Sequence, residues 1–126
     1  MTVSQYIVTV RLSLLPPSVN SAYVTNKSGK GRGRFKSAAY KAWETLSGHE
    51  LNIQKPGHVA GAYAATYVFG RKNKRSDLGN LEKLVSDLLV AHRVVEDDAL
   101  AQEIRLSWGP VEGVYIQVCS TKERGA

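Results

Sequence analysis

The sequence predicts a single domain of the α/β class, more narrowly α+β, in which helices pack on a mixed β-sheet. The chain of 126 residues has the size of one ordinary domain, and its apolar content of 43% is typical of a globular protein. Segments with an apolar period of two alternate with segments of helical period. No internal repeat or linker divides the sequence. We therefore expect one domain over residues 1–126, with elements in the order β-α-β-α-β-β.

The first third of the chain predicts a strand, a loop and a helix. Residues 6–13 alternate apolar and polar side chains, as in a strand, and Pro16-Pro17 ends this pattern. Residues 21–36 are polar, basic and rich in glycine, without an apolar period, so we expect a mobile basic loop there. Ser37 is suited to cap a helix that runs to about Leu51.

The remaining sequence predicts three strands and a second helix. Tyrosine and β-branched residues over 58–69 indicate a strand, with a bulge or kink at Gly61. A helix over about 78–92 follows from four apolar residues at i, i+3, i+4 and i+7, namely Leu81, Leu84, Val85 and Leu88. Two further strands are expected around 104–108 and 114–119, before a frayed tail at 121–126.

Charge and cysteine content narrow the class of protein. The net charge of +6 and the pI near 9.6 indicate an acidic partner, a bias that nucleic-acid-binding, ribosomal and membrane-surface proteins share. Cys119 is the single cysteine, so the chain has no internal disulfide and no zinc-ligand spacing, which suits a reducing cytosol. The sequence has no signal-peptide pattern and no apolar run of transmembrane length. We therefore expect a cytoplasmic protein without a membrane partner.

All four aspartates of the chain lie between residues 77 and 98, directly after a basic run. The run consists of Arg71, Lys72, Lys74 and Arg75, and the aspartates are Asp77, Asp87, Asp97 and Asp98. Carboxylate oxygens are the ligands that Mg²⁺ prefers, and clustered lysine and arginine suit a polyanion. The sequence therefore predicts a magnesium site beside a phosphate-binding surface.

The predicted second helix carries polar side chains on one flank of its apolar stripe. At about 100° per residue, Asn80, Lys83 and Asp87 fall within an arc of roughly 60°. These three polar residues therefore share one face of the helix.

This set of residues resembles a known signature. The segment Arg75-Ser76-Asp77-Leu78-Gly79-Asn80-Leu81-Glu82-Lys83, followed by Asp87 and Asp97-Asp98, is similar to the central motif of the RusA family of Holliday-junction resolvases, usually met in phages and prophages. The opening Leu15-Pro16-Pro17-Ser18-Val19-Asn20 matches the same family, so the resemblance covers most of the chain. It implies a RusA-like fold and a homodimer that resolves four-way DNA junctions by paired nicks in the cytosol of a bacterium or phage-infected host.

The resemblance also implies roles for individual residues. Asp77 and Asp98 would hold Mg²⁺, with Mn²⁺ as a substitute, and Lys83 would stabilise the transition-state phosphate or orient the attacking water. Asn80, Asp87 and Asp97 would support these groups. The DNA phosphates would be tracked by two basic sets, Lys30, Arg32, Arg34 and Lys36 in the loop and Arg71, Lys72, Lys74 and Arg75 in the run.

The sequence departs from the family pattern at Gly79, where an aspartate is usual. Two interpretations follow. Either Asp77 and Asp98 hold Mg²⁺ with additional waters, or the protein binds junctions without cutting them well. We expect activity to be retained, because the other motif positions and the basic run are present.

Several site residues have a structural interpretation as well. Asp77 is also placed to cap the helix that follows it, and Asp97-Asp98 is also typical of an acidic turn or of the cap of a short helix. Lys83 is also placed for a surface ion pair with Asp87. Tyr23, in the loop, is the candidate to stack on an unpaired base.

Two other functions stay open at this point. One is a catalytically weak or inactive protein that binds branched DNA, and the other is a basic RNA-binding module. The glycine-rich loop lacks the Gly-Lys-Ser/Thr ending of a P-loop, so we expect no nucleotide cofactor.

Overall fold

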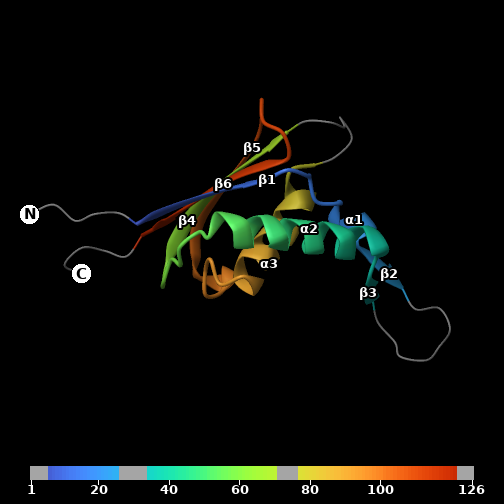
Figure 1. The fold of residues 1–126 in the computed structure, drawn as a ribbon, viewed down its shortest axis with the longest axis horizontal. Helices are drawn as coiled ribbons and strands as arrows, with labels where there is room; N and C mark the ends of the chain where they lie inside the picture. Colours follow the sequence, from blue (N-terminus) through green and yellow to red (C-terminus); the bar gives the residue numbers. More distant parts are fainter. Residues whose placement is uncertain (1–5, 26–33, 71–76, 122–126) are drawn as a thin grey trace, which may run out of the picture.

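The computed structural model describes residues 6–25, 34–70 and 77–121, and it confirms the predicted fold class of one mixed sheet with helices (Figure 1). The four strands of this sheet lie in the order β1-β6-β4-β5. Their bounds are β1 Ile7–Leu12, β4 Tyr63–Gly70, β5 Ala101–Gly109 and β6 Val114–Ser120. Only the β4-β5 pair is parallel; β1-β6 and β4-β6 are antiparallel.

Two long helices, α2 (Ala38–Gln54) and α3 (Gly79–Ala91), lie on the same side of this sheet (Figure 1). As predicted, Ser37 caps α2, because its hydroxyl accepts a hydrogen bond from the backbone N–H of Tyr40 at 3.2 Å. The helix ends at Gln54, where Lys55 adopts a left-handed backbone with φ 50° and closes the last turn onto Leu51. None of the described helices combines the length and apolar character that crossing a lipid bilayer requires.

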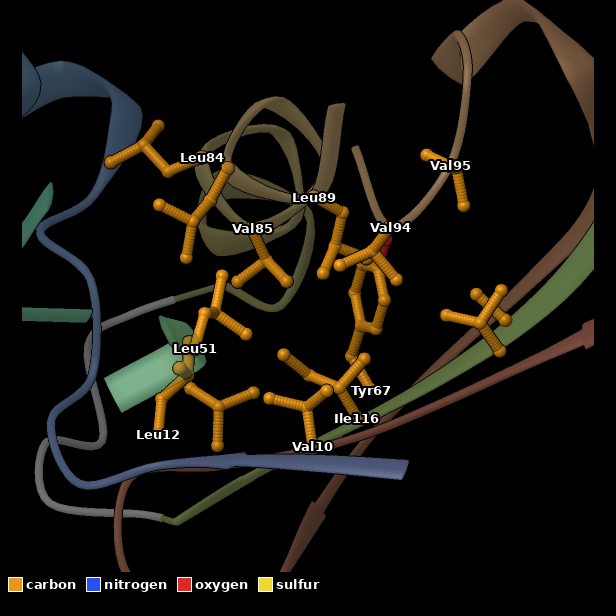
Figure 2. Packing of buried hydrophobic residues seen from close by; sticks show 14 of the residues in the cluster. Val10, Leu12, Leu51, Tyr67, Leu84, Val85, Leu89, Val94, Val95 and Ile116 are labelled. Carbon is orange, nitrogen blue, oxygen red and sulfur yellow. The ribbon is translucent and has the colours of Figure 1, made fainter. Parts of the chain in front are cut away.

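The core lies between the sheet and the two helices. Figure 2 shows side chains from the sheet meeting Leu84, Val85 and Leu89 of α3 and Leu51 of α2; the sheet contributes Val10, Tyr67 and Ile116. The predicted stripe of α3 is buried along its whole length, and each such side chain contributes about 1.5–3 kcal/mol to stability. Burying this stripe sets the rotation of α3 about its axis. The polar flank of the helix is therefore turned outward.

The prediction of a loop over residues 21–36 is wrong at both ends of this segment. A short helix α1 (Val19–Ala22) precedes β2 (Tyr23–Thr25), and β2 pairs antiparallel with β3 (Arg34–Lys36) as a separate two-stranded sheet. The N–H of Ser37 donates to the carbonyl of Ala22 at 2.7 Å, which ties the hairpin base to the start of α2. These elements are too short for an apolar period to show. Residues 26–33 lie outside the described part of the chain.

The largest difference between a predicted and an observed element boundary lies at the start of β4. The strand expected from residue 58 begins only at Tyr63, because Gly61 adopts a left-handed backbone with φ 74° and turns the chain. Before that turn, Val59 forms a single parallel bridge with Val95. The other predicted strands and the second helix are confirmed, with ends shifted by a few residues. The 3₁₀ turn η1 (Asp98–Leu100) is the short helix that was one of the alternatives for Asp97-Asp98. The predicted frayed tail over 121–126 is wrong at its first residue, because the N–H of Thr121 donates a hydrogen bond to the carbonyl of Ala62 at 3.0 Å. Residues 122–126 lie outside the described part of the chain.

Candidate functional site

Lys83 lies between two carboxylates that come from different parts of the chain. Its Nζ atom is 3.1 Å from Oδ1 of Asp87, one turn further along α3, and 3.3 Å from Oδ2 of Asp98 in η1. Hydrogen bonds to Asp87 and Asp98 raise the pKa of Lys83 above its usual range, so the ammonium group stays charged at neutral pH. The structure thus brings three predicted site residues together. The ion pair with Asp87 that we gave as an alternative is present, and it is part of this larger cluster.

The chain reverses direction after α3, and this reversal places Asp98 next to Lys83. Arg93 adopts a left-handed backbone with φ 60°, and the Val59 to Val95 bridge then holds the returning segment. Asp97 caps η1, since its Oδ1 accepts a hydrogen bond from the N–H of Ala99 at 2.9 Å. The cap interpretation of Asp97 is therefore confirmed, and Asp98 is the neighbour that faces Lys83.

These residues line an open cleft of about 380 Å³ between α2, α3, η1 and the β2-β3 hairpin. The lining comprises Tyr23, Lys36, Tyr40, Glu44, Lys83, Asp87, Val90, Ala91 and Asp98. Lys36 provides a second ammonium group, with its Nζ 2.8 Å from Oε2 of Glu44, and this hydrogen bond raises the pKa of Lys36. The cleft therefore presents two cations, each held in place by acidic side chains.

The aromatic side chains of the cleft pack on one another. The ring of Tyr23 meets Tyr40 edge to face, with centroids 5.5 Å apart, and the guanidinium of Arg34 lies 4.4 Å from the centroid of Tyr23. Tyr40 is buried, and burial raises the pKa of its hydroxyl. The ring of Tyr23 is partly buried and already has Arg34 over it, which does not favour Tyr23 as the stacking residue.

A chain of hydrogen-bonded polar side chains between β4 and α3 was not predicted. The hydroxyl of Tyr67 lies 2.9 Å from Oγ of Ser86, and Ser86 in turn donates a hydrogen bond to the carboxylate of Glu82. The hydroxyl of Tyr63 is buried and has no hydrogen-bond partner among the described residues. Burial, with a smaller effect of the negative charge of Asp98 and Glu82, raises the pKa of Tyr63 to about 12. The spacing of Glu82 and Ser86 along the helix suggested no site, because their partner Tyr67 comes from β4.

Asp77 is exposed directly before α3 and does not cap it with its side chain. The helix begins after Leu78, which makes no side-chain cap bond, so the cap alternative for Asp77 is wrong. The carbonyl of Asp77 accepts a hydrogen bond from the N–H of Asn80 at 3.0 Å. This hydrogen bond fixes the backbone of Asn80, and among the described residues no hydrogen bond joins the Asn80 side chain to Lys83.

The donor chemistry of the site suits Mg²⁺ only if water completes the coordination. Over residues 6–25, 34–70 and 77–121, no three histidine, cysteine, aspartate or glutamate side chains form a group that could hold a metal ion. Mg²⁺ commonly binds one or two carboxylates and keeps several waters. Of the two predicted ligands, Asp98 lines the cleft, whereas Asp77 is not among the residues that line it. The position of Gly79 is open, since a Cβ atom there would meet no atom within 4 Å.

Of the predicted phosphate-binding residues, two lie in the described part of the chain. Lys36 lines the cleft, and Arg34 lies over Tyr23 at its edge. The six others, Lys30, Arg32, Arg71, Lys72, Lys74 and Arg75, lie outside it.

No protein-family model matches this sequence, and no curated protein matches it. The resemblance to the RusA family therefore depends on the motif residues alone and stays a prediction.

Proposed function

We propose that this protein is a Mg²⁺-dependent, structure-selective DNA endonuclease that resolves four-way junctions by paired phosphodiester nicks. The observation that carries the proposal is the ammonium group of Lys83, held between Asp87 and Asp98 in an open cleft that contains a second lysine. Hydrolysis of a phosphodiester builds negative charge on the non-bridging oxygens and on the departing oxygen. A cation with a fixed position stabilises that charge.

The side chains of the cleft have separable tasks in this proposal. Asp87 orients Lys83 along α3, so that its ammonium group faces the cleft with little loss of side-chain freedom when a phosphate arrives. Lys36 binds a neighbouring phosphate by exchanging its contact with Glu44. Asp77 and Asp98 are the residues that would hold Mg²⁺, which when bound supplies Lewis-acid stabilisation and an activated water.

The proposed partner is branched DNA, bound by a homodimer in the cytosol. The net charge of +6 favours a polyanion, and two copies of the cleft at one branch point would account for paired nicks. No nucleotide cofactor is required by this chemistry.

One observation favours a second candidate, a protein that binds junctions but cuts them poorly. Gly79 stands where the family pattern has a carboxylate, and the described residues contain no group of three or more metal-ligating side chains. Fewer carboxylates lower the affinity for Mg²⁺, whereas the lysines that contact phosphate are unaffected.

A nicking assay on a synthetic four-way junction separates these candidates. The substrates are the junction, a linear DNA duplex of equal length and an RNA duplex, each with Mg²⁺, Mn²⁺ or EDTA. Nicking of the junction that requires a divalent metal supports the endonuclease. Tight, junction-selective binding without nicking supports the second candidate, and equal binding to the RNA duplex contradicts both.

Two variants test whether the cleft is the site of nicking. Lys83→Met should abolish nicking, since it removes the ammonium group from the cleft. Lys41→Met is the matched control, because Lys41 is an exposed lysine of α2 that does not line the cleft.

A further inference from the structure

The two edges of the four-stranded sheet differ in how their backbone is covered. At the β1 edge, the side chain of Gln54 accepts a hydrogen bond from the N–H of Arg11 at 2.8 Å and donates one to its carbonyl at 2.7 Å, as a neighbouring strand would. Glu50 accepts another from the N–H of Ser13. The β5 edge has no such cover within the described residues, where no side chain from another element bonds the backbone of residues 101–107. Such an edge is a template for a further strand.

The strand at this edge is long, and its side chains are incompletely covered on both sides of the sheet. β5 spans nine residues, Ala101–Gly109. Ile104 and Leu106 lie on the helix side, next to core residues of β4, and are only partly buried. Glu103 and Arg105 lie on the opposite side, which α2 and α3 leave open (Figure 1), and their side chains are 53% and 74% exposed.

The charges of β5 are complementary to those of a second β5 strand. In an antiparallel pair of two β5 strands centred on Ile104, Glu103 stands directly opposite the partner's Arg105, and the two-fold symmetry repeats this pair. Opposite charges that face each other across two strands stabilise a sheet, whereas like charges destabilise it. A pair centred on Glu103 or on Arg105 would bring that residue opposite its own copy. The charges therefore favour the register centred on Ile104.

The same register joins apolar side chains on the helix side of the sheet. Ile104 stands opposite its own copy, and Leu106 of each strand lies diagonally beside the partner's Ile104. These side chains are partly buried in one copy and would be covered further by the second, which favours association. A shift of the register by one residue would instead set Glu103 against Ile104 and mix charged with apolar side chains.

We propose that β5 is the interface between two copies of this chain, which pair their β5 strands antiparallel about Ile104 and join two four-stranded sheets into one of eight strands. The two-fold axis of such a pair is perpendicular to the sheet, so the helices of both copies lie on the same side. The cleft of Lys83 lies between elements on that side, so the dimer presents both clefts in one direction. The inference deepens the proposed function, and it rests on that function for the use of the paired clefts.

Reversal of one charge at a time provides the first test. Glu103→Arg places only arginines at the two facing positions, and Arg105→Glu places only glutamates there. Each variant alone should dimerise at least about tenfold more weakly than the wild type in sedimentation velocity. An equimolar mixture of the two should restore a dimer, because every arginine of one copy then faces a glutamate of the other.

Two further proteins control this experiment. The double variant Glu103→Arg/Arg105→Glu exchanges the two side chains and should dimerise like the wild type. Lys41→Glu reverses an exposed charge on α2, the helix whose Gln54 covers the β1 edge, and should also dimerise like the wild type. Thermal melts should show every variant folded, because the pair within β5 is exposed and such pairs contribute little to stability.

A disulfide tests the register without relying on charge. Directly opposite Cα atoms in an antiparallel pair lie about 4.5–5.5 Å apart, which a disulfide spans. With the single cysteine removed by Cys119→Ser, Ile104→Cys should therefore form a covalent dimer under mild oxidation. Ile53→Cys in the same background is the matched control, because Ile53 is an exposed apolar residue of α2, and it should stay uncrosslinked.

Several outcomes overturn the interface. A wild type that sediments as a monomer at every concentration does so, as do single-charge variants that dimerise like the wild type or a mixture that restores no dimer. If a charge variant fails to fold, the disulfide decides alone, and crosslinking of Ile104→Cys no faster than that of Ile53→Cys contradicts the register.

None of these measurements uses DNA, so the interface and the proposed function fail separately. A dimer that is restored by mixing the two charge variants, in a protein that nicks no junction, leaves the interface standing while the proposed function fails. Metal-dependent junction nicking by a wild type that fails the mixing test leaves the proposed function standing without this interface.

Discussion

The ammonium nitrogen of Lys83 lies 3.3 Å from Oδ2 of Asp98, although 15 positions separate the two residues in the chain. This contact shows which of the adjacent carboxylates faces the cleft. Asp97 is engaged in capping η1, and Asp98 is left to meet the lysine. We therefore expect that removing the carboxylate of Asp98, rather than that of Asp97, stops nicking of the DNA.

Replacing Asp98 or Asp77 with asparagine should abolish or severely reduce nicking, while junction binding stays intact or tightens. Each change removes a proposed metal ligand and a negative charge near the phosphate, and both positions are accessible enough for the fold to be retained. Nicking and gel-shift titrations of the same preparations measure the two effects. Glu50→Gln, outside the cleft, is the control and should behave like the wild type. Full nicking by either aspartate variant removes that residue from the site.

Neutralising Arg32 and Arg34 together should weaken binding to all DNA shapes by similar factors. Each lost duplex phosphate contact lowers the slope of log K against log[salt] by about 0.9, so the double variant should flatten it by up to about 1.8. Binding titrations over a series of salt concentrations measure the slope. An unchanged slope means that neither arginine contacts DNA phosphates.

Glu44→Gln should tighten DNA binding, because the carboxylate that pairs with Lys36 competes with a phosphate for the same ammonium group. The expected gain is severalfold at low salt and smaller at high salt, since the competing pair is partly exposed and screened. Glu50→Gln is the control, because Glu50 lies on the same helix but its Oε1 accepts a hydrogen bond from the N–H of Ser13, outside the cleft. Weaker binding by Glu44→Gln would mean that Glu44 positions Lys36 for the phosphate instead of competing with it.

Gly79→Asp should lower the Mg²⁺ concentration needed for half-maximal nicking. The added side chain has open space, and a carboxylate in the first turn of α3 complements the helix dipole, so the fold should accept it. Metal titrations of nicking, beside junction-binding curves for both proteins, test this. An unchanged or higher metal requirement with intact binding contradicts the idea of a depleted metal site. Weaker binding would instead show that the backbone at Gly79 approaches the DNA closely.

Glu96→Gln should destabilise the protein near neutral pH and have less effect in acid. A hydrogen bond from the N–H of Gly61 and the nearby His58 lower the pKa of Glu96 below 4.5. A lowered pKa in the folded state contributes stability that is present above the unfolded value and is lost as pH falls through the folded one. The difference in Tm between wild type and variant should therefore be largest above the unfolded pKa of about 4.3 and shrink as the pH falls below it. A difference that does not change with pH contradicts this assignment.

Local patterns in the sequence determined the main elements of this protein. The alternation over residues 6–13 and the stripe of Leu81, Leu84, Val85 and Leu88 identify β1 and α3 because the spacing of apolar residues decides which face is buried. The same helical geometry placed Lys83 and Asp87 on one flank, where they form an ion pair. Ser37 identified the start of α2 because a cap depends on neighbours along the chain.

Only the tertiary structure decided what lies around that flank. The order β1-β6-β4-β5 and the meeting of Lys83 with Asp98 depend on contacts between residues far apart in the chain, which no local period records. The short strands β2 and β3 form because each pairs with the other, and their pairing places Arg34 over the ring of Tyr23 and leaves Phe35 exposed. The sequence by itself thus determined which residues share a helix or strand face. Folding alone decided which faces meet, because the burial of apolar surface that joins them is a property of the whole chain.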